Sequence, residues 1–425
     1  MTIEETEFDV GAVTRRSFMG KAGMGIAGFA AGSALLAACG GSDGDSGPAA
    51  TADSASSDSG SDAAESDGAD TSGTVAEDSG SDEETVQLAQ DEGLPEIEID
   101  MATSWPTGLV TLFGAAQIFS EQVSRLTGGR LTINSRPAGE IVGGLEVLTA
   151  VRDGGAQAGH TASYYYTGES PATQFGTAVP FGLTSRQQNA WLYQGGGLEL
   201  MREFYAENFG VIQFPAGNTG VQMGGWFTKE INSIDDIQGL TMRIPGLAGQ
   251  VLNNLGGEQV SLAGGDILPS IQSGAIDAAE FVGPTDDLIL GLDELGSELF
   301  YYHPGWWEPG PSLEVELPLS FWNDLPEQYQ AAIENAAAHS NVQTMATYDV
   351  LNPRDLQVIK GFAEIREFPE DVMSAFKEET ENVLDTTADG NSDFASILAP
   401  WREYRDAVQE WHGLAETSML RAGSL

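Results

Sequence analysis

The fold is decided by residues 96–136, EIEIDMATSWPTGLVTLFGAAQIFSEQVSRLTGGRLTINSR. Residues 96–105 and 131–136 alternate apolar and polar side chains, as half-buried strands do. Between them, residues 111–129 repeat their apolar side chains with a helical period and end in glycines, which is a helix stop signal. A strand, a helix and a second strand in this order predict an α/β protein.

The same alternation continues along the chain. We expect strands at 156–166, 211–216, 220–228, 239–245, 276–282 and 312–320, and helices at 145–155, 186–210, 248–256 and 266–274, the last with Asp266 as its N-cap. The C-terminal third carries further helices at 325–352, 371–387 and 392–416, and the first is long enough to cross two lobes. The pattern predicts two hinged α/β lobes, a long spanning helix and a helical C-terminus.

Charge limits the classes of partner. The 425 residues include 64 Asp and Glu against 18 Lys and Arg, which gives a formal net charge of −46. Such a chain is unsuited to neutralising the phosphates of a nucleic acid, and its charge also disfavours binding to anionic membrane surfaces. An acidic surface with few lysines suits a high-salt habitat, where charge repulsion is screened.

The N-terminus has the pattern of an export signal. TRRSFM (14–19) is a twin-arginine pattern, and the apolar run GMGIAGFAAGSALLAA (23–38) leads into Cys39, the only cysteine of the sequence. LAAC (36–39) resembles a lipoprotein cleavage box, so we interpret residues 1–39 as a twin-arginine lipoprotein signal. Cleavage would leave Cys39 as a lipidated first residue, anchored at the outer face of the cell membrane or in the periplasm. A short transmembrane helix is the alternative, although the run is short and glycine-rich for a span of about 20 residues.

A low-complexity segment follows the signal. Residues 40–84 contain no aromatic and no basic side chain. Such a segment cannot bury enough apolar surface to offset the entropy of ordering it. We therefore expect a disordered acidic linker over 40–90 that holds a two-lobed binding domain, residues 91–425, away from the membrane.

Common signatures of enzymes are missing from the sequence. The four histidines are widely scattered, and no pair of them has metal-ligand spacing. Neither a nucleophile elbow, a phosphate-binding loop nor a dinucleotide fingerprint is present. These absences disfavour an enzyme.

Four polar residues stand out within apolar or glycine-rich stretches: Asn218, Gln222, Arg243 and Glu280. Taken singly, each has an ordinary explanation as a turn residue or a solvated strand residue. Taken together they predict one site, because a buried Glu needs a partner and an arginine fork matches a carboxylate. One arginine suggests a ligand with one carboxylate.

Four stretches resemble the extracytoplasmic solute-binding subunits of TRAP transporters: GNTGVQMGGWF (217–227), GLTMRIPG (239–246), GGDILPSIQSGAIDAAEFVGP (264–284) and YYHPGWWEPGP (301–311). Several motifs agree in order and spacing, and the resemblance covers residues 97–425. It is closest to the branch that binds 2-oxo acids such as pyruvate, near the lactate and the mannitol/chloroaromatic members. The resemblance implies a periplasmic-binding-protein-like fold of two hinged lobes.

The resemblance also implies roles for individual residues. Arg243 is expected to clamp the ligand carboxylate, with help from Asn218. Gln222, Glu280 and the backbone carbonyl of Phe281 are expected to bind a cation, which is sodium or alternatively calcium. A 2-oxo acid-binding member of the family has Trp where this chain has Phe281. A backbone ligand survives that change, but the pocket wall and the ligand preference differ.

One tyrosine of the run 164–166 is expected to contact the ligand, with Tyr165 and Tyr166 as the candidates. Charge supports the cation, because Glu280 and a ligand carboxylate in one dry cleft would repel each other. Oxygen ligands converging on a cation remove this conflict. Family position places Trp306, Trp307 and Glu308 near the cleft, but ordinary core packing explains the aromatic rings equally well.

We therefore expect the ligand-capturing subunit of a TRAP-type secondary transporter, which closes on a small monocarboxylate such as pyruvate and delivers it to the membrane subunits. Two other classes stay open. One is a sensory ligand-binding lipoprotein with the same site, and the other is an exported enzyme, such as a lyase, that uses the same cleft. The helices at 325–352 and 392–416 suggest a homodimer.

Overall fold

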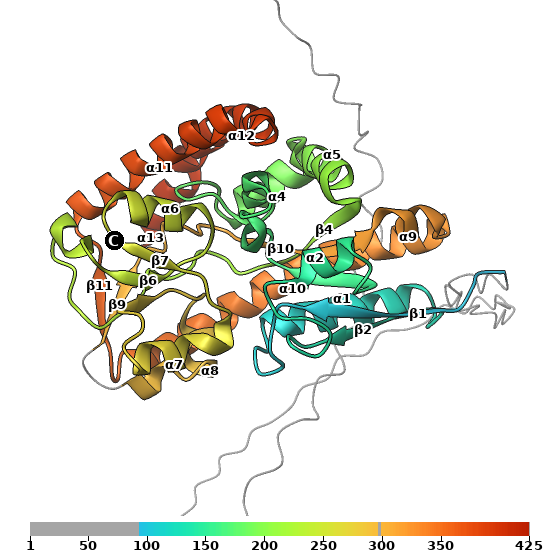
Figure 1. Ribbon diagram of the computed structural model, residues 1–425, viewed down its shortest axis with the longest axis horizontal. Coiled ribbons are helices and arrows are strands. Elements are labelled where there is room, and N and C mark those ends of the chain that lie inside the picture. Colours follow the sequence, from blue (N-terminus) through green and yellow to red (C-terminus); the bar gives the residue numbers. More distant parts are fainter. Residues whose placement is uncertain (1–92, 296–298, 425) are drawn as a thin grey trace, which may run out of the picture. The chain divides into compact units, whose positions relative to one another are not determined.

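The computed structural model describes residues 93–295 and 299–424. The predicted signal at 1–39, with Cys39, and the predicted linker at 40–90 lie outside the described residues. Within the described ranges, two mixed sheets are surrounded by helices, as Figure 1 shows, so the predicted α/β class is confirmed. None of the helices in these ranges is both long enough and apolar enough to cross a membrane.

The first sheet has the strand order β2-β1-β3-β10-β4. β1 is parallel to β2 and β3, whereas β10 is antiparallel to β3 and β4. β10 therefore returns to this sheet from much later in the chain. The bounds are β1 Ile97–Thr103, β2 Leu131–Arg136, β3 Ala158–Thr161, β4 Val211–Asn218 and β10 Ser312–Pro318.

The second sheet has the strand order β11-β9-β5-β8-β6-β7. Its strands are short, and β5 runs antiparallel to both of its neighbours, β8 and β9. The bounds are β5 Gly225–Phe227, β6 Thr241–Arg243, β7 Glu258–Val260, β8 Ala278–Ala279, β9 Phe300–His303 and β11 Glu364–Glu367. The chain crosses from the first sheet to the second after β4 and returns after β9, which divides the described residues into two lobes.

Helix α1 (Leu112–Leu126) illustrates how the apolar pattern sets an element. Ala116, Phe119 and Val123 recur every three or four residues and pack with side chains of the first sheet in one core cluster. Gly128 and Gly129 follow with φ of 61° and 79°, a conformation that ends a helix at little steric cost. The predicted helix and its stop signal are confirmed.

Helix α10 (Glu327–Ile359) joins the two lobes. Ser340 donates to the carbonyls of Ala115 and Ala216 in the first lobe, at 2.7 and 3.0 Å. Two turns later, Tyr348 donates to Asp286 in the second lobe at 2.5 Å. The predicted spanning helix is therefore confirmed, but its predicted end at 352 was wrong, because the helix continues through Pro353.

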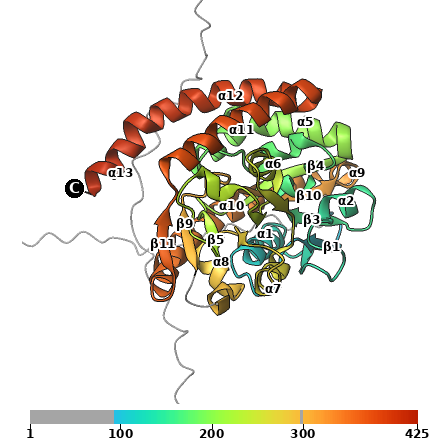
Figure 2. The same cartoon turned by 60° about the vertical axis from the view of Figure 1, so that its left-hand side comes forward.

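The other helices cover the outer faces. Figure 2 shows α12 lying along α11 and leading into α13 at the C-terminus. Their bounds are α2 Val147–Arg152, α3 Gln174–Thr177, α4 Ser185–Gln194, α5 Gly197–Phe209, α6 Gly246–Asn254, α7 Ile267–Gln272, α8 Pro284–Ile289, α9 Leu319–Asp324, α11 Glu370–Gly390, α12 Ser392–His412 and α13 Ser418–Gly423.

Two predicted elements of the first lobe are divided in the structure. The strand predicted at 156–166 ends at Thr161, and Ser163–Tyr166 form a 3₁₀ turn. The turn begins where the backbone N–H of Ser163 donates to the side chain of Thr177 at 2.7 Å rather than to a neighbouring strand. The helix predicted at 186–210 is two helices, since Gly196 between them has φ of 82°.

Predicted strands of the second lobe are shorter than expected. Only 225–227 of the range 220–228 and 278–279 of the range 276–282 pair with neighbours. Residues 219–224, before β5, form instead the crossing segment that leads from the first sheet to the second. There the backbone N–H of Gln222 donates to the carbonyl of Glu308 at 3.2 Å. Asp266 does precede α7, but its side chain makes no capping bond. Strands β7, β9 and β11 were not predicted.

Candidate ligand and cation site

Arg243 lies at the end of β6, between β7 and β8, and its side chain is 1% exposed. Nε donates to the carbonyl of Leu262 at 3.1 Å. Nη1 donates to the carbonyl of Glu280 at 3.1 Å and also to its carboxylate. Among the described residues, Nη2 has no hydrogen-bond partner. Leu262 and Glu280 thus hold the guanidinium in place, while Nη2 remains able to bind an anion.

Two buried carboxyl groups, those of Glu280 and Glu308, lie beside this arginine. In each, Oε2 lacks a hydrogen-bond partner within the described residues. Burial raises the pKa of Glu280 to about 7, and the Arg243 guanidinium opposes this rise. Burial also raises the pKa of Glu308 well above its usual range, and repulsion by Glu280 adds to the effect. The two acids can therefore be ionised together only if positive charge is added to that of Arg243.

Gln222 lies in the crossing segment between the sheets. Its Nε2 donates to Thr219 at 3.3 Å, and its backbone carbonyl accepts from Gly305 at 3.0 Å. Its Oε1 is buried and, in the described part of the chain, accepts no hydrogen bond. The backbone bond from Gln222 to the carbonyl of Glu308 brings this amide to the same region as the two carboxyl groups.

Asn218 is fully buried at the end of β4. Its Nδ2 donates to the carbonyl of Gly310 at 3.2 Å, and its Oδ1 accepts from the backbone of Gly220 at 2.9 Å. The bond to Gly310 joins the segment after β4 to the segment before β10, and the bond from Gly220 is local. The expected role of Asn218 toward the ligand stays a prediction, and the bonds seen here shape the cleft.

The three tyrosines of the run 164–166 lie on two different sides of the turn that they form. Burial raises the pKa values of Tyr164 and Tyr165, and Arg243, Glu280 and Glu308 act on both hydroxyls. Both tyrosines line a cavity of about 50 Å³ together with Leu262, the residue that orients Arg243.

Tyr166 faces elsewhere. Its hydroxyl exchanges a hydrogen bond with Thr161 at 2.8 Å and accepts from the backbone of Leu148 at 3.1 Å. The charged groups nearest to it are Glu316 and Glu314 of β10, not Arg243. Of the two candidate tyrosines, the structure brings Tyr165 to Arg243 and does not bring Tyr166 there.

The aromatic pair at 306–307 also separates. Trp306 stacks on Phe376 and Phe181, with ring centroids 4.4 and 5.4 Å apart, and therefore serves packing. Trp307 lies close enough to Glu280 to lower the pKa of that carboxyl, although its indole N–H does not meet hydrogen-bond geometry. Glu308 is the site residue that the sequence left undecided, and a carboxylate beside two tryptophans was the signal.

The donor set fits a hard cation. Gln222, Glu280 and Glu308 present oxygens without partners among the described residues, and Phe281 follows Glu280 directly. Sodium and calcium prefer such oxygen ligands. No cluster of three His, Cys, Asp or Glu side chains suited to a metal occurs within the described ranges, so a cation here would depend on amide or carbonyl oxygens as well.

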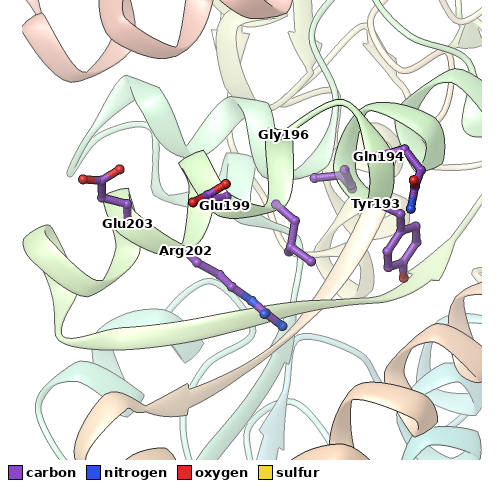
Figure 3. A pocket seen from close by; sticks show the side chains of 8 residues that line it. Tyr193, Gln194, Gly196, Glu199, Arg202 and Glu203 are labelled. Atoms are coloured by element: carbon purple, nitrogen blue, oxygen red, sulfur yellow. The ribbon is translucent and has the colours of Figure 1, made fainter. Parts of the chain in front are cut away.

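A second, larger hollow of about 730 Å³ lies beside α4 and α5. Figure 3 shows side chains that line it. Glu199 and Glu203 stand along it, which disfavours an anionic ligand. Its Arg202 is occupied, because it donates to Glu334 at 3.1 Å and stacks on Phe214 at 4.7 Å. Arg243, whose Nη2 has no partner among the described residues, is therefore the better candidate to bind a carboxylate.

Comparison with known proteins places this geometry in a family. A family model for bacterial extracellular solute-binding protein, family 7, matches residues 101–391. A monocarboxylate 2-oxoacid-binding periplasmic protein of Nostoc sp. (strain PCC 7120 / SAG 25.82 / UTEX 2576) is 46% identical over 327 residues, which are 77% of this chain and 89% of that protein.

Solved structures agree with this assignment. A TRAP transporter solute-binding protein from Bordetella bronchiseptica RB50, a mixed-occupancy dimer with calcium and picolinate, is 37% identical with a TM-score of 0.75, over 77% of this chain and 97% of that one. One from Pseudoalteromonas atlantica T6c, with sodium and pyruvate, is 34% identical with a TM-score of 0.73, over 77% and 99%. The chain therefore belongs to the bacterial extracellular solute-binding proteins of family 7, the extracytoplasmic binding subunits of TRAP transporters, as its motifs predicted.

Proposed function

We propose that this protein captures a small monocarboxylate of the 2-oxo acid type together with a sodium or calcium ion. It passes the acid to the membrane subunits of a TRAP-type secondary transporter. The observation that carries the proposal is a set of buried polar atoms around Arg243 that have no hydrogen-bond partner among the described residues. They include Nη2 of Arg243 and oxygens of Gln222, Glu280 and Glu308. The charge of Arg243 acts on both glutamates.

Binding involves a change of partners. Arg243 already contacts the carboxylate of Glu280 in this structure, so a ligand acid must compete with Glu280 for the guanidinium. The ligand carboxylate then takes Arg243, and Glu280 turns to the cation.

Each residue has a separate part in this exchange. Leu262 and the carbonyl of Glu280 fix the guanidinium, so Arg243 loses little side-chain entropy when the ligand binds. Gln222, Glu280 and the carbonyl of Phe281 hold the cation, which supplies the positive charge that two buried acids and a ligand acid require. Closure of the lobes excludes water and strengthens these contacts.

Calorimetry with pyruvate tests the proposal directly. The purified domain is titrated with pyruvate in the presence of sodium or calcium, and in a buffer that contains only a bulky organic cation. We expect binding that depends on the metal ion and is lost in Arg243→Ala. Arg202→Ala is the matched control, since it removes an arginine from the larger hollow. The proposal is wrong if none of pyruvate, lactate and picolinate binds. It is also wrong if Arg243→Ala binds pyruvate as tightly as the unaltered protein does.

Capture requires no chemical step. The ligand is therefore expected to be recovered unchanged after long incubation, as mass spectrometry of the released acid can show. Turnover of the bound acid would instead support an exported enzyme that uses the same cleft.

Tethering to the membrane rests on the sequence alone. The twin-arginine pattern at 14–19 and the box at 36–39 support export followed by lipidation of Cys39. Mass spectrometry of the mature N-terminus is expected to find a lipidated Cys39, and Cys39→Ser should release the protein from membranes. A mature protein cleaved elsewhere and free of lipid contradicts the anchor.

Homodimerisation is supported by apolar side chains on the C-terminal helices. Trp411, Leu414, Met419 and Leu420 are between 60% and 75% exposed. Covering such side chains with a second copy would remove them from water. Light scattering of the full chain is expected to report a dimer that Leu414→Glu weakens, whereas a monomer at all concentrations would exclude it.

A further inference from the structure

Two glutamates of β10 lie on the inner face of the first sheet. Glu314 and Glu316 are two residues apart on a strand, so their side chains point to the same face. Glu314 pairs with Thr161 of β3, and Glu316 pairs with Gly159. On the other side of the strand, Glu316 pairs with Gln213 of β4. The pair thus occupies the centre of the sheet rather than its edge.

Both carboxyl groups are buried, and most of their oxygens are unsatisfied. Glu314 is 1% exposed and Glu316 is fully buried. Tyr205 donates to Oε1 of Glu314 at 2.5 Å. Within the described residues, Oε2 of Glu314 and both oxygens of Glu316 have no partner, and the same holds for Nε2 of Gln213. Unpaired polar atoms at such depth cost free energy, so these four atoms need an explanation.

In the described part of the chain, neither carboxyl group forms a salt bridge, and no Lys, Arg or His acts on their pKa values. The titratable neighbours of the pair are the hydroxyls of Tyr166 from the turn at 163–166 and of Tyr205 from α5. The arginines of the helices on this face pair elsewhere: Arg152 of α2 with Glu169, and Arg202 of α5 with Glu334. The acidic side chains of α5, at positions 199, 203 and 207, are exposed. His160, the neighbour on β3, turns to the opposite face and contacts Trp105 and Ala216.

A single proton satisfies all four atoms. When Glu316 is protonated, one of its oxygens donates to Oε2 of Glu314, and the other accepts from Nε2 of Gln213, which is directly opposite in the ladder and within reach. Burial raises the pKa of Glu314 to about 7 and that of Glu316 well above its usual range, and repulsion by Glu314 adds to the second shift. Both directions agree with a pair that keeps one proton.

The pair lies beneath the turn that presents two tyrosines to the candidate ligand site. Ser163 and Tyr166 of this turn face the acids: a methyl group at Gly176 would lie 2.6 Å from Oγ of Ser163 and 3.1 Å from Oε2 of Glu314. Tyr164 and Tyr165 face Arg243. The turn therefore has the acid pair on one side and the ligand cavity on the other.

We propose that Glu314 and Glu316 share one proton, and that the protonated pair acts as a positioning device that supports the turn presenting Tyr164 and Tyr165 to the ligand. Loss of the proton would place two negative charges in this core, separate the two side chains and displace the turn. The part of the inference that concerns the ligand rests on the proposed function. The shared proton does not.

Infrared spectroscopy tests the proton itself. Wild-type protein at neutral pH is expected to show the carbonyl stretch of a buried, protonated carboxylic acid, and this band should be lost in Glu316→Gln. Because the cleft acids also titrate, the comparison is made in the presence of calcium and pyruvate. Glu258→Gln, an exposed glutamate of β7, is the matched control and should leave the band unchanged. A spectrum of the unaltered protein without a band that depends on Glu316 overturns the proposal.

A bound metal ion is the rival explanation for the open oxygens. Native mass spectrometry with calcium is expected to count the same number of ions in wild-type protein and in Glu316→Gln. One ion fewer in the variant would show that the pair binds a metal rather than a proton, and would likewise overturn the proposal.

Pyruvate affinity as a function of pH tests the positioning role. Above the pH at which the pair ionises, wild-type affinity should fall by up to about tenfold per pH unit relative to Glu316→Gln, which can donate a hydrogen bond but cannot ionise. Parallel pH profiles would remove the link to the turn. Absence of pyruvate binding in all proteins would instead count against the proposed function, while the infrared result would still decide the shared proton.

Discussion

The candidate ligand cleft and the acid pair beneath the turn each bury two carboxyl groups, but the negative charge is compensated differently in the two regions. Each region buries two glutamates: Glu280 with Glu308 in the cleft, and Glu314 with Glu316 under the turn. In the cleft, Arg243 contacts one of the acids and still has an open nitrogen. Beneath the turn, hydroxyl and amide groups surround the pair, and no salt bridge to it occurs among the described residues.

The difference separates binding from support. A carboxylate compensated by an arginine and a metal ion can change partners, because a ligand acid can replace it on the guanidinium. Two carboxyls that share a proton have no such partner to exchange, so they can only hold together or repel. We therefore propose that the same residue type, in equivalent burial, binds a ligand and cation in one region and supports the fold in the other.

Removal of Arg243 should have the largest effect on this comparison. Arg243→Ala leaves Glu280 without its cationic partner and removes the anion site, so pyruvate affinity should fall about a thousandfold, or about 4 kcal/mol. Calorimetry of the variant measures this loss, and Arg243→Lys should recover only part of it because Lys lacks the planar fork. A loss of less than about tenfold would show that the carboxylate lies elsewhere.

Neutralising one acid in each region should sharpen the contrast. Glu280→Gln removes a charged oxygen from the proposed cation site and should lower pyruvate affinity about a hundredfold, or about 2.7 kcal/mol, with loss of the dependence on calcium. Glu314→Gln is the matched variant in the other region. Titration with and without calcium should find its metal dependence unchanged, and an equal loss in both variants would contradict the division of roles.

The sequence predicted the cleft better than the support beneath it. Arg243 and Glu280 stood out because charged residues interrupt apolar runs, and the structure brings them into contact. The register of the run 164–166 was not predictable, since three consecutive tyrosines give no periodicity. A 3₁₀ turn replaces the expected strand there, which sends Tyr166 to the acid pair and Tyr165 to Arg243.

The burial of Glu314 and Glu316 could not be predicted from the sequence, for a different reason. In SLEVELPLS (312–320) the two glutamates alternate with Leu313, Val315 and Leu317, which is the pattern of a strand with one solvated face. Both faces of β10 are covered in the structure, by elements distant in the chain. Local pattern cannot report burial that arises from such distant contacts.

The pH dependence of stability should distinguish the protonated pair. Burial raises the pKa of Glu314 from its ordinary value of 4.5 to about 7, so the folded pair keeps a proton that the unfolded chain releases between these values. The contribution of this group is thus full below about pH 4.5 and is lost as the pH rises toward 7, with a slope of about 1.4 kcal/mol per pH unit. Urea unfolding of the wild type should show this slope relative to Glu314→Gln. Equal slopes in the two proteins would mean that Glu314 ionises normally.

Enlarging the ring at position 281 should have the smallest effect and should act on the cleft alone. Phe281 lies against Arg243, with its ring centroid 5.6 Å from Cζ, and a methyl group at Gly264 would lie 2.8 Å from the ring. Phe281→Trp keeps the backbone carbonyl proposed as a cation ligand but has little space to extend toward Gly264, so the larger ring must occupy part of the cleft.

We expect Phe281→Trp to weaken binding of branched or aromatic acids such as picolinate by about tenfold, or about 1.4 kcal/mol, because overpacking of this order is typical of an added ring in a filled space. Pyruvate affinity and calcium dependence should change much less, since Arg243 and the carbonyl of residue 281 are retained. Paired titrations with picolinate and pyruvate measure the ratio. An equal loss for both acids would place the ring in the cation site rather than on the wall that selects the ligand.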